Sequence, residues 1–149
     1  MDTQNLQDSI VLNQILANQN VLLHKTLNFH WNVTGSNFGG DHAFFKDLYE
    51  ACFTRIDDVA ERIRAVGARP VGSMARYLQI ATIAEAPVEI PTAAEMYRIL
   101  AADWDAVITR IKEQLKTLDE NSVSTRNFLE EMVTVLEKEH WMIKAHIAE

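Results

Sequence analysis

The sequence predicts an all-α protein, a four-helix bundle with a short extra helix in the long connection between its second and third helices. Three observations support this prediction. The 149 residues are 48% hydrophobic but include only five Gly and three Pro, which are too few turn formers for an all-β chain. Four long stretches repeat apolar residues at steps of three and four, which is the period of an amphipathic helix. All three prolines fall within residues 67–91, so one connection is long.

The first two predicted helices form a hairpin. The first helix spans residues from about 4 to 33, and residues 34–40 (TGSNFGG) hold three glycines in seven positions, which is typical of a turn. The second helix follows this turn and is closed by Gly67. The apolar stripe of the first helix contains Leu12, Leu16, Leu23 and Leu27, and that of the second contains Phe45, Leu48, Cys52, Ile56, Val59, Ile63 and Val66.

The long connection occupies residues 67–91, where the prolines prevent the second helix from continuing. Within it, residues 73–81 (SMARYLQIA) predict a short helix of two turns, which would keep the connection ordered. The third long helix begins directly after Pro91, because Thr92 and Glu95 form a T-x-x-E capping box.

The third helix continues to Leu118, residues 119–122 (DENS) form a short turn, and the fourth helix completes the bundle. The stripe of the third helix contains Tyr97, Leu100, Trp104, Ile108, Ile111, Leu115 and Leu118, and that of the fourth contains Leu129, Met132, Leu136, His140, Ile143 and Ile147. Four amphipathic helices with one long connection between the second and third form the ferritin-like arrangement. We find no internal repeat or low-complexity tract, so we expect a single domain over residues 1–149.

Charge and composition exclude several classes of function. The formal net charge is −7, and residues 1–24 contain no Lys or Arg, so we expect no direct binding to DNA through a basic arm. The single cysteine, Cys52, rules out an intrachain disulfide and suits a reducing compartment. No apolar run approaches the roughly 20 residues that a bilayer requires. We therefore expect a cytoplasmic protein that does not enter a membrane.

The five histidines are the first candidates for metal ligands. A diiron site inside a ferritin-like bundle needs an E-x-x-H motif on each of two helices. The sequence has only one such motif, Glu137 to His140, so that site is predicted to be missing. His140 lies on an apolar stripe and is predicted to be either a core histidine or a residue that contacts the ligands of a site without binding the metal itself.

The second helix carries a different set of candidate ligands. His42, Asp57 and Glu61 point away from its apolar stripe, and Asp57 and Glu61 lie one turn apart, where they can bind one cation together. His42 lies about 22 Å from Asp57 along the helix, so one chain cannot bring them together. Two chains can do so if the helix packs antiparallel on its own copy, with His30 joining His42. Such a mixed histidine and carboxylate site suits Fe(II) oxidation.

Two motifs in these helices resemble the signatures of the Dps family, the miniferritins also called DNA-binding proteins from starved cells. The first is His30-Trp31-Asn32-Val33-Thr34-Gly35, followed by Phe38 and His42. The second is Ile56-Asp57-Asp58-Val59-Ala60-Glu61-Arg62, followed by Gly67 and Pro70. The resemblance covers the whole chain and implies a hollow dodecamer with ferroxidase centres at its two-fold interfaces.

In this family, Fe(II) is oxidised, preferably by hydrogen peroxide, and is stored inside the cage as a ferric mineral. The resemblance implies that His30 and His42 bind iron from one subunit and that Asp57 and Glu61 bind it from the partner subunit. It also places Trp31 beside the centre. By analogy, Glu130 and Glu131 would line a pore.

Two residues depart from the family pattern. Asp41 stands where the family usually has an aliphatic residue, and Lys46 stands where it usually has an acid. The Lys46 ammonium has no lone pair and repels cations, so one of the two expected iron positions is affected. Two alternatives to an active ferroxidase remain. One is a nonenzymatic cage whose centre is impaired by Lys46, and the other, disfavoured by the charge, is a nucleoid-binding protein.

Overall fold

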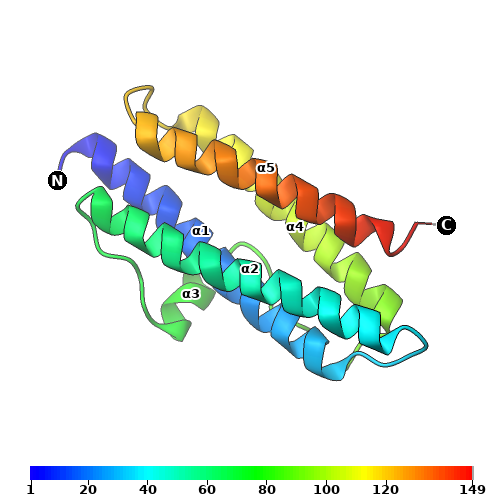
Figure 1. The fold of residues 1–149 in the computed structure, drawn as a ribbon. Coiled ribbons are helices and arrows are strands. Elements are labelled where there is room, and N and C mark those ends of the chain that lie inside the picture. The colour runs from blue at the N-terminus through cyan, green and yellow to red at the C-terminus, as the bar shows by residue number, and fades with distance from the viewer. Residues whose placement is uncertain (149) are drawn as a thin grey trace.

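The computed structural model describes residues 1–148, and those residues contain five helices and no strand. In chain order they are α1 (Thr3–Asn32), α2 (Phe38–Ala65), α3 (Met74–Ile80), α4 (Ala93–Thr117) and α5 (Val123–Ala145) (Figure 1). The four long helices form the bundle, and the short α3 lies in the connection between α2 and α4. The predicted all-α fold, with its extra helix, is confirmed.

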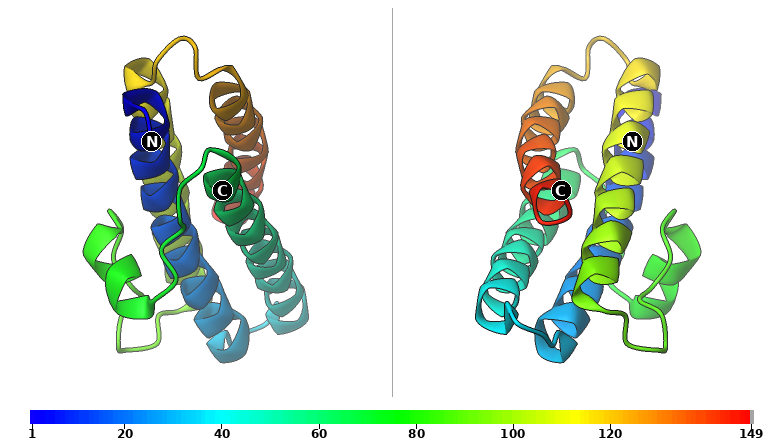
Figure 2. Two further views of the ribbon diagram at one scale, coloured as in Figure 1. Left: turned by 90° about the vertical axis from the view of Figure 1, so that its left-hand side faces the viewer. Right: turned by 90° about the vertical axis from the view of Figure 1, so that its right-hand side faces the viewer.

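The helices are arranged as two antiparallel pairs. In the two views of Figure 2, α1 lies beside α2 and α4 lies beside α5, while α3 packs on the outer side of α1. The turn between α1 and α2 lies at one end of the bundle, and the turn between α4 and α5 lies at the opposite end. The first end also contains the start of α4 and the end of α5, so residues from all four long helices meet there.

Local signals in the sequence account for several helix ends. The Thr92 hydroxyl accepts from the Glu95 backbone N–H at 3.2 Å, and a Glu95 carboxylate oxygen accepts from the Thr92 N–H at 2.9 Å. The predicted capping box is therefore present. Gly67 follows the end of α2 with a φ of 89°, a left-handed conformation that glycine adopts without strain.

Two predicted boundaries were wrong. The predicted turn over residues 34–40 is shorter, because α2 begins at Phe38 and its first turn includes two of the glycines. Gly35, with a φ of 124°, already provides the backbone reversal. The fourth long helix begins at Val123 and ends at Ala145, so Ile147 lies beyond it although it packs against the core.

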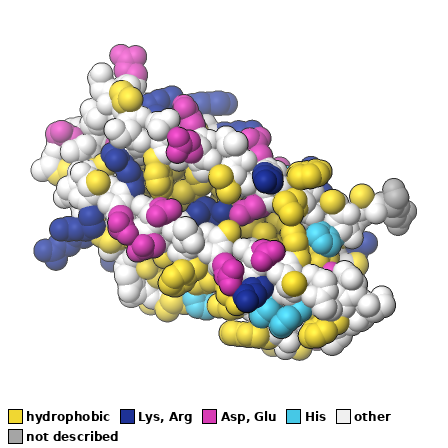
Figure 3. All heavy atoms as spheres, viewed as in Figure 1, with side chains coloured by type: hydrophobic (Ala, Val, Ile, Leu, Met, Phe, Trp, Pro, Cys, Tyr) yellow, Lys and Arg dark blue, Asp and Glu magenta, His cyan; other side chains and the backbone are white. Residues whose placement is uncertain are grey.

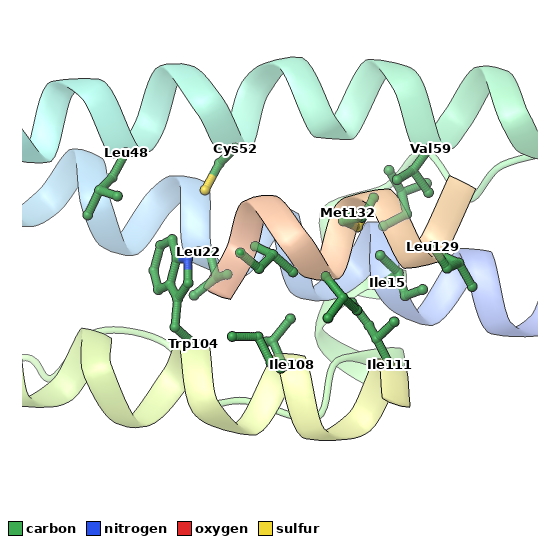
Figure 4. Packing of buried hydrophobic residues seen from close by; sticks show 14 of the residues in the cluster. Ile15, Leu22, Leu48, Cys52, Val59, Trp104, Ile108, Ile111, Leu129 and Met132 are labelled. Carbon is green, nitrogen blue, oxygen red and sulfur yellow. The ribbon is translucent and has the colours of Figure 1, made fainter. Parts of the chain in front are cut away.

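The apolar stripes meet in one core along the bundle axis (Figure 4). Its largest fully buried side chains include Trp104, Phe29 and Phe45. Trp104 points from α4 toward Leu48 and Cys52 of α2 in the close view. None of the helices within residues 1–148 has the length and hydropathy that a membrane span requires.

Candidate metal centre

His30 and His42 lie against each other at the α1–α2 end of the bundle. Their rings stack with centroids 3.7 Å apart and an angle of 15° between the planes. His30 Nδ1 lies 2.6 Å from the His42 carbonyl oxygen, and His42 Nδ1 lies 2.7 Å from the His30 carbonyl oxygen. A carbonyl oxygen only accepts hydrogen bonds, so each Nδ1 must carry the proton and donate. In the neutral form of each ring this leaves the lone pair on Nε2, the nitrogen that could bind a metal ion.

Aromatic side chains hold this pair of imidazoles in place. Phe38 stacks on His42 with centroids 5.1 Å apart, and Tyr49 packs edge-on against His30 at 5.2 Å. His30 is buried and His42 is half-buried. Fixed orientation and tautomer are the properties that protein groups around a metal site supply to histidine ligands. Figure 3 shows histidine side chains gathered at this end, with basic and acidic side chains beside them.

Asp57 and Glu61 form a second, separate pair on the exposed face of α2. A hydrogen bond between the two carboxyl groups, together with the negative charge of Asp57, raises the pKa of Glu61 above its ordinary value. Two carboxylates this close repel each other unless they share a proton or a cation. A bound divalent cation would relieve this repulsion.

One chain does not bring the histidine pair and the carboxylate pair together. Fifteen residues of α2 separate His42 from Asp57, which corresponds to about 22 Å along the helix. Within residues 1–148, no three side chains of His, Cys, Asp or Glu are grouped so that they could hold a metal ion. Each chain thus carries two separate sets of candidate ligands, neither of which is a complete metal site by itself.

Lys46 lies on α2 one turn after His42 and is exposed. Its ammonium is 3.8 Å from a Glu50 carboxylate oxygen, and both side chains are more than half exposed. An exposed ion pair of this kind contributes little to stability, about 0–1 kcal/mol. The Lys46 side chain is therefore free to change partners at little energetic cost.

Asp41 is a buried residue whose contacts sequence analysis did not predict. One of its carboxylate oxygens accepts a hydrogen bond from the Tyr97 hydroxyl at 2.6 Å and another from Asn37 Nδ2 at 3.0 Å. Only its departure from the family pattern marks it in the sequence. Its partner Tyr97 lies on α4, and no local sequence rule pairs those two positions.

The bundle interior contains an ion pair between α2 and α5. Arg55 donates to Glu139 at 2.9 Å and to Gln19 at 2.8 Å, and the other Glu139 oxygen accepts from the Trp104 indole at 3.0 Å. Arg55 thus places a permanent positive charge inside the bundle, an arrangement that disfavours a cation there.

The core position predicted for His140 was wrong, whereas the alternative, that His140 supports a site, stays a prediction. His140 is only half-buried, and it is Glu139, the preceding residue, that reaches the interior. The helical period places neighbouring residues about 100° apart, so an apolar stripe read by eye can miss the inward position by one residue.

A protein-family model described as a ferritin-like domain matches residues 11–149. The chain is also 36% identical over 138 residues to DNA protection during starvation protein 2 from Bacillus anthracis, which covers 92% of this chain and 94% of that protein. The chain belongs to the Dps family of ferritin-like proteins. This membership confirms the resemblance carried by the two sequence motifs.

Solved structures agree with this assignment to the Dps family. A Dps protein from Bacillus brevis is 33% identical and superposes with a TM-score of 0.94, over 99% of both chains. A Dps protein from Vibrio cholerae is 29% identical, has a TM-score of 0.92 and covers 98% of this chain and 92% of its own. That protein is described as a member of a broad superfamily of ferritin-like diiron-carboxylate proteins. Family membership therefore indicates a role in iron storage and protection against stress.

Proposed function

We propose that this chain is the subunit of a cytoplasmic iron-storage cage that oxidises Fe(II) at centres shared between subunits. His30 and His42 of one subunit bind Fe(II) together with Asp57 and Glu61 of the partner subunit. Hydrogen peroxide or oxygen accepts the electrons, and the ferric product is stored as a mineral. By analogy with the Dps family, the cage is a dodecamer. Removing Fe(II) and peroxide together protects the cell from hydroxyl radicals.

The observation that carries this proposal is the stacked histidine pair, whose Nε2 atoms are both left free by the Nδ1 hydrogen bonds. Imidazole nitrogen and carboxylate oxygen together make a ligand set suited to Fe(II). Carboxylates also balance the extra charge of Fe(III), so the partner's Asp57 and the partner's Glu61 favour loss of an electron. The raised pKa of Glu61 reflects the hydrogen bond between these two carboxyl groups and their mutual repulsion, which a bound cation would relieve.

The stoichiometry of the peroxide reaction follows from electron balance. Reduction of one hydrogen peroxide to two waters breaks the O–O bond and consumes two electrons and two protons. Each Fe(II) loses one electron, so two Fe(II) are oxidised for each peroxide. No hydroxyl radical is released when both electrons reach the same peroxide, so a centre that holds one iron tightly needs a second Fe(II), bound only transiently, to supply the second electron.

A surface beside the histidines supports pairing with a second copy of the chain. An apolar groove of about 510 Å³ runs along α1 and α2, lined by Leu23, Leu27, Tyr49 and Phe53 among others. Phe53 is 65% exposed and Trp31, next to His30, is 66% exposed. Large exposed apolar side chains along one face indicate an interaction surface. An antiparallel pairing of α2 over this groove would bring the partner's Asp57 toward His42 and complete two centres at once.

Lys46 is expected to limit each centre to one tightly bound iron. The histidine pair and the two carboxylates balance the charge of one Fe(II), but a second Fe(II) would need a further acid, and Lys46 stands where the family usually has one. In the metal-free assembly the Lys46 ammonium can pair with Asp57 or Glu61 of the partner subunit, and iron must then displace it. Lys46 also favours the second candidate, a nonenzymatic cage that binds metal without oxidising it.

The deciding experiment is an anaerobic Fe(II) titration of the purified protein, followed by hydrogen peroxide or oxygen while ferric absorbance is recorded. We expect a rapid rise after saturation of the tight site. Asp57→Ala and Glu61→Ala should abolish this phase, whereas Asp105→Ala, which removes an exposed acid on α4, should leave it unchanged. Fe(II) binding without any ferric phase would favour the nonenzymatic cage, and no saturable Fe(II) binding would contradict both candidates.

A further inference from the structure

Asp41 is a carboxylate buried in the first turn of α2, with only 5% of its surface exposed. Aspartate is rarely buried unless its oxygens have hydrogen-bond partners. Here the Tyr97 hydroxyl donates to Asp41 at 2.6 Å, and the Asn37 amide donates to the same oxygen at 3.0 Å. The short distance to Tyr97 is typical of a strong hydrogen bond to a carboxylate.

Tyr97 connects this carboxylate to the rest of the bundle. It lies on α4, is 3% exposed, and packs against Phe45 of α2 with ring centroids 4.9 Å apart. On another side it stacks on His146 at 4.3 Å, just after α5. Burial and the bond to Asp41 raise the pKa of Tyr97 well above its ordinary value, so its hydroxyl remains a donor. Asp41 thus fastens the start of α2 to a rigid part of the core.

The backbone that Asp41 fastens is also the backbone that orients the histidines. Asp41 immediately precedes His42, whose carbonyl oxygen accepts from His30 Nδ1 at 2.6 Å. The His42 ring in turn donates to the His30 carbonyl at 2.7 Å. A rotation of the first turn of α2 would therefore move one ring directly and release the other from its acceptor.

We propose that Asp41 is a positioning residue of the metal centre, which acts by holding the first turn of α2 against Tyr97 so that His30 and His42 keep their metal-binding orientation. The inference rests on the proposed role of these histidines and deepens it. An aliphatic residue at position 41 would pack against α4 through contacts that have no preferred direction. A carboxylate that accepts two hydrogen bonds fixes the rotation of the turn, because hydrogen bonds are directional. Groups that orient metal ligands in this way affect metal affinity by about 10–100-fold.

The test compares two tyrosine variants that each remove one hydroxyl. Tyr97→Phe deletes the donor to Asp41 and keeps the ring. Tyr77→Phe is the matched control, because the Tyr77 hydroxyl donates to the Val71 carbonyl at 2.8 Å in the connection around α3. Asp41→Asn retains an oxygen that can accept from Tyr97, whereas Asp41→Ala removes it.

The first measurement is anaerobic titration of each assembled protein with Co(II) alone, following its visible absorption bands. We expect Tyr97→Phe and Asp41→Ala to weaken Co(II) binding by about tenfold or more and to shift the bands. Asp41→Asn should stay close to wild type, and Tyr77→Phe should match it. A loss of general stability alone would not change the spectrum of the bound ion in a protein that remains assembled.

The second measurement is hydrogen exchange of the metal-free proteins over residues 34–45. Exchange should be faster in Tyr97→Phe and Asp41→Ala than in Tyr77→Phe. Wild-type exchange together with wild-type Co(II) binding in Tyr97→Phe would overturn the positioning role. If Tyr97→Phe does not assemble, equal Co(II) affinity in Asp41→Asn and Asp41→Ala would overturn it instead. If the His42→Ala variant binds Co(II) as tightly as the wild type, the proposed function is contradicted. The exchange result tests the role of Asp41 independently of that outcome.

Discussion

His30 and His42 each donate a hydrogen bond from Nδ1 to the other residue's backbone carbonyl, at 2.6 and 2.7 Å, while their rings stack 3.7 Å apart. This reciprocal contact joins the last turn of α1 to the first turn of α2 and fixes the tautomer of both rings. The backbone, rather than a carboxylate, supplies the orienting acceptors. The two rings are therefore held in a fixed orientation by the backbone of this single chain.

The first prediction tests whether the centre is shared between subunits. Cages carrying both His30→Ala and His42→Ala should lack ferroxidase activity, and so should cages carrying both Asp57→Ala and Glu61→Ala. Reassembly of the two inactive proteins together should restore activity. Random pairing makes half of the interfaces mixed, each with one intact centre, so about a quarter of the wild-type sites should return. Initial rates of Fe(II) oxidation after mixing measure this recovery.

Two controls accompany the mixing experiment. Each variant is dissociated and reassembled alone, and neither should gain activity. A monomer of 16.9 kDa that bound Fe(II) tightly, or mixed cages that remained inactive although they had exchanged subunits, would contradict a shared centre.

The second prediction concerns Lys46. Lys46→Asp replaces a positive charge with a carboxylate one turn from His42, so it should raise the number of tightly bound Fe(II) per centre from one toward two. It should also speed oxidation, because two electrons can then leave from one centre. Lys138→Asp makes the same charge change at an exposed position of α5 and should alter neither quantity. Wild-type protein that already binds two Fe(II) tightly per centre would show that Lys46 does not limit binding.

The third prediction concerns the ion pair inside the bundle. Glu139→Ala leaves the Arg55 guanidinium buried without its carboxylate partner and should lower the free energy of unfolding by about 3–5 kcal/mol. Glu137→Ala breaks an ion pair with Lys112 that is 52% exposed on both sides, and it should cost no more than about 1 kcal/mol. Urea unfolding followed by circular dichroism compares the two. Equal effects would indicate that water reaches Arg55.

The fourth prediction is a pH dependence set by Cys52. Burial raises the pKa of its thiol from the ordinary value of 9.0 to about 12. Between these values the unfolded chain loses the thiol proton while the folded chain keeps it, so this contribution to stability is full below pH 9 and is lost as pH rises toward 12. The loss should be at most about 1.4 kcal/mol per pH unit. Cys52→Ala should therefore show a shallower alkaline decline in urea unfolding than wild type, and parallel curves would count against a buried thiol.

The fifth prediction concerns DNA. Binding to duplex DNA depends mainly on neutralisation of phosphates by Lys and Arg, and this chain has a net charge of −7 with no basic residue in positions 1–24. The protein should not shift duplex DNA in a gel at physiological salt. A version with a tail of several lysines before Met1 serves as the positive control and should bind in a salt-sensitive manner. A shift by the natural chain at that salt would reveal a basic surface patch.

Local signals in the sequence determined the helices. Apolar stripes, the prolines of the long connection, Gly67 and the Thr92–Glu95 capping box predicted five helices in the right order, because each signal acts within one or two turns of backbone. The rise per residue of a helix also separated the candidate ligands into two pairs, since His42 and Asp57 are too far apart along one straight helix.

Only the tertiary structure decided which polar groups meet. Asp41 and Tyr97 are 56 residues apart, and Arg55 and Glu139 are 84 residues apart, so their pairing depends on how four helices rotate and pack. Sequence periodicity defines which face of a helix is apolar, but a buried charge on that face is tolerated only when a partner from another helix satisfies it. The contact between His30 and His42 depends both on the local sequence and on the tertiary structure. The turn between their helices places them near each other, and packing of α1 on α2 sets the two hydrogen bonds that leave each Nε2 free for metal.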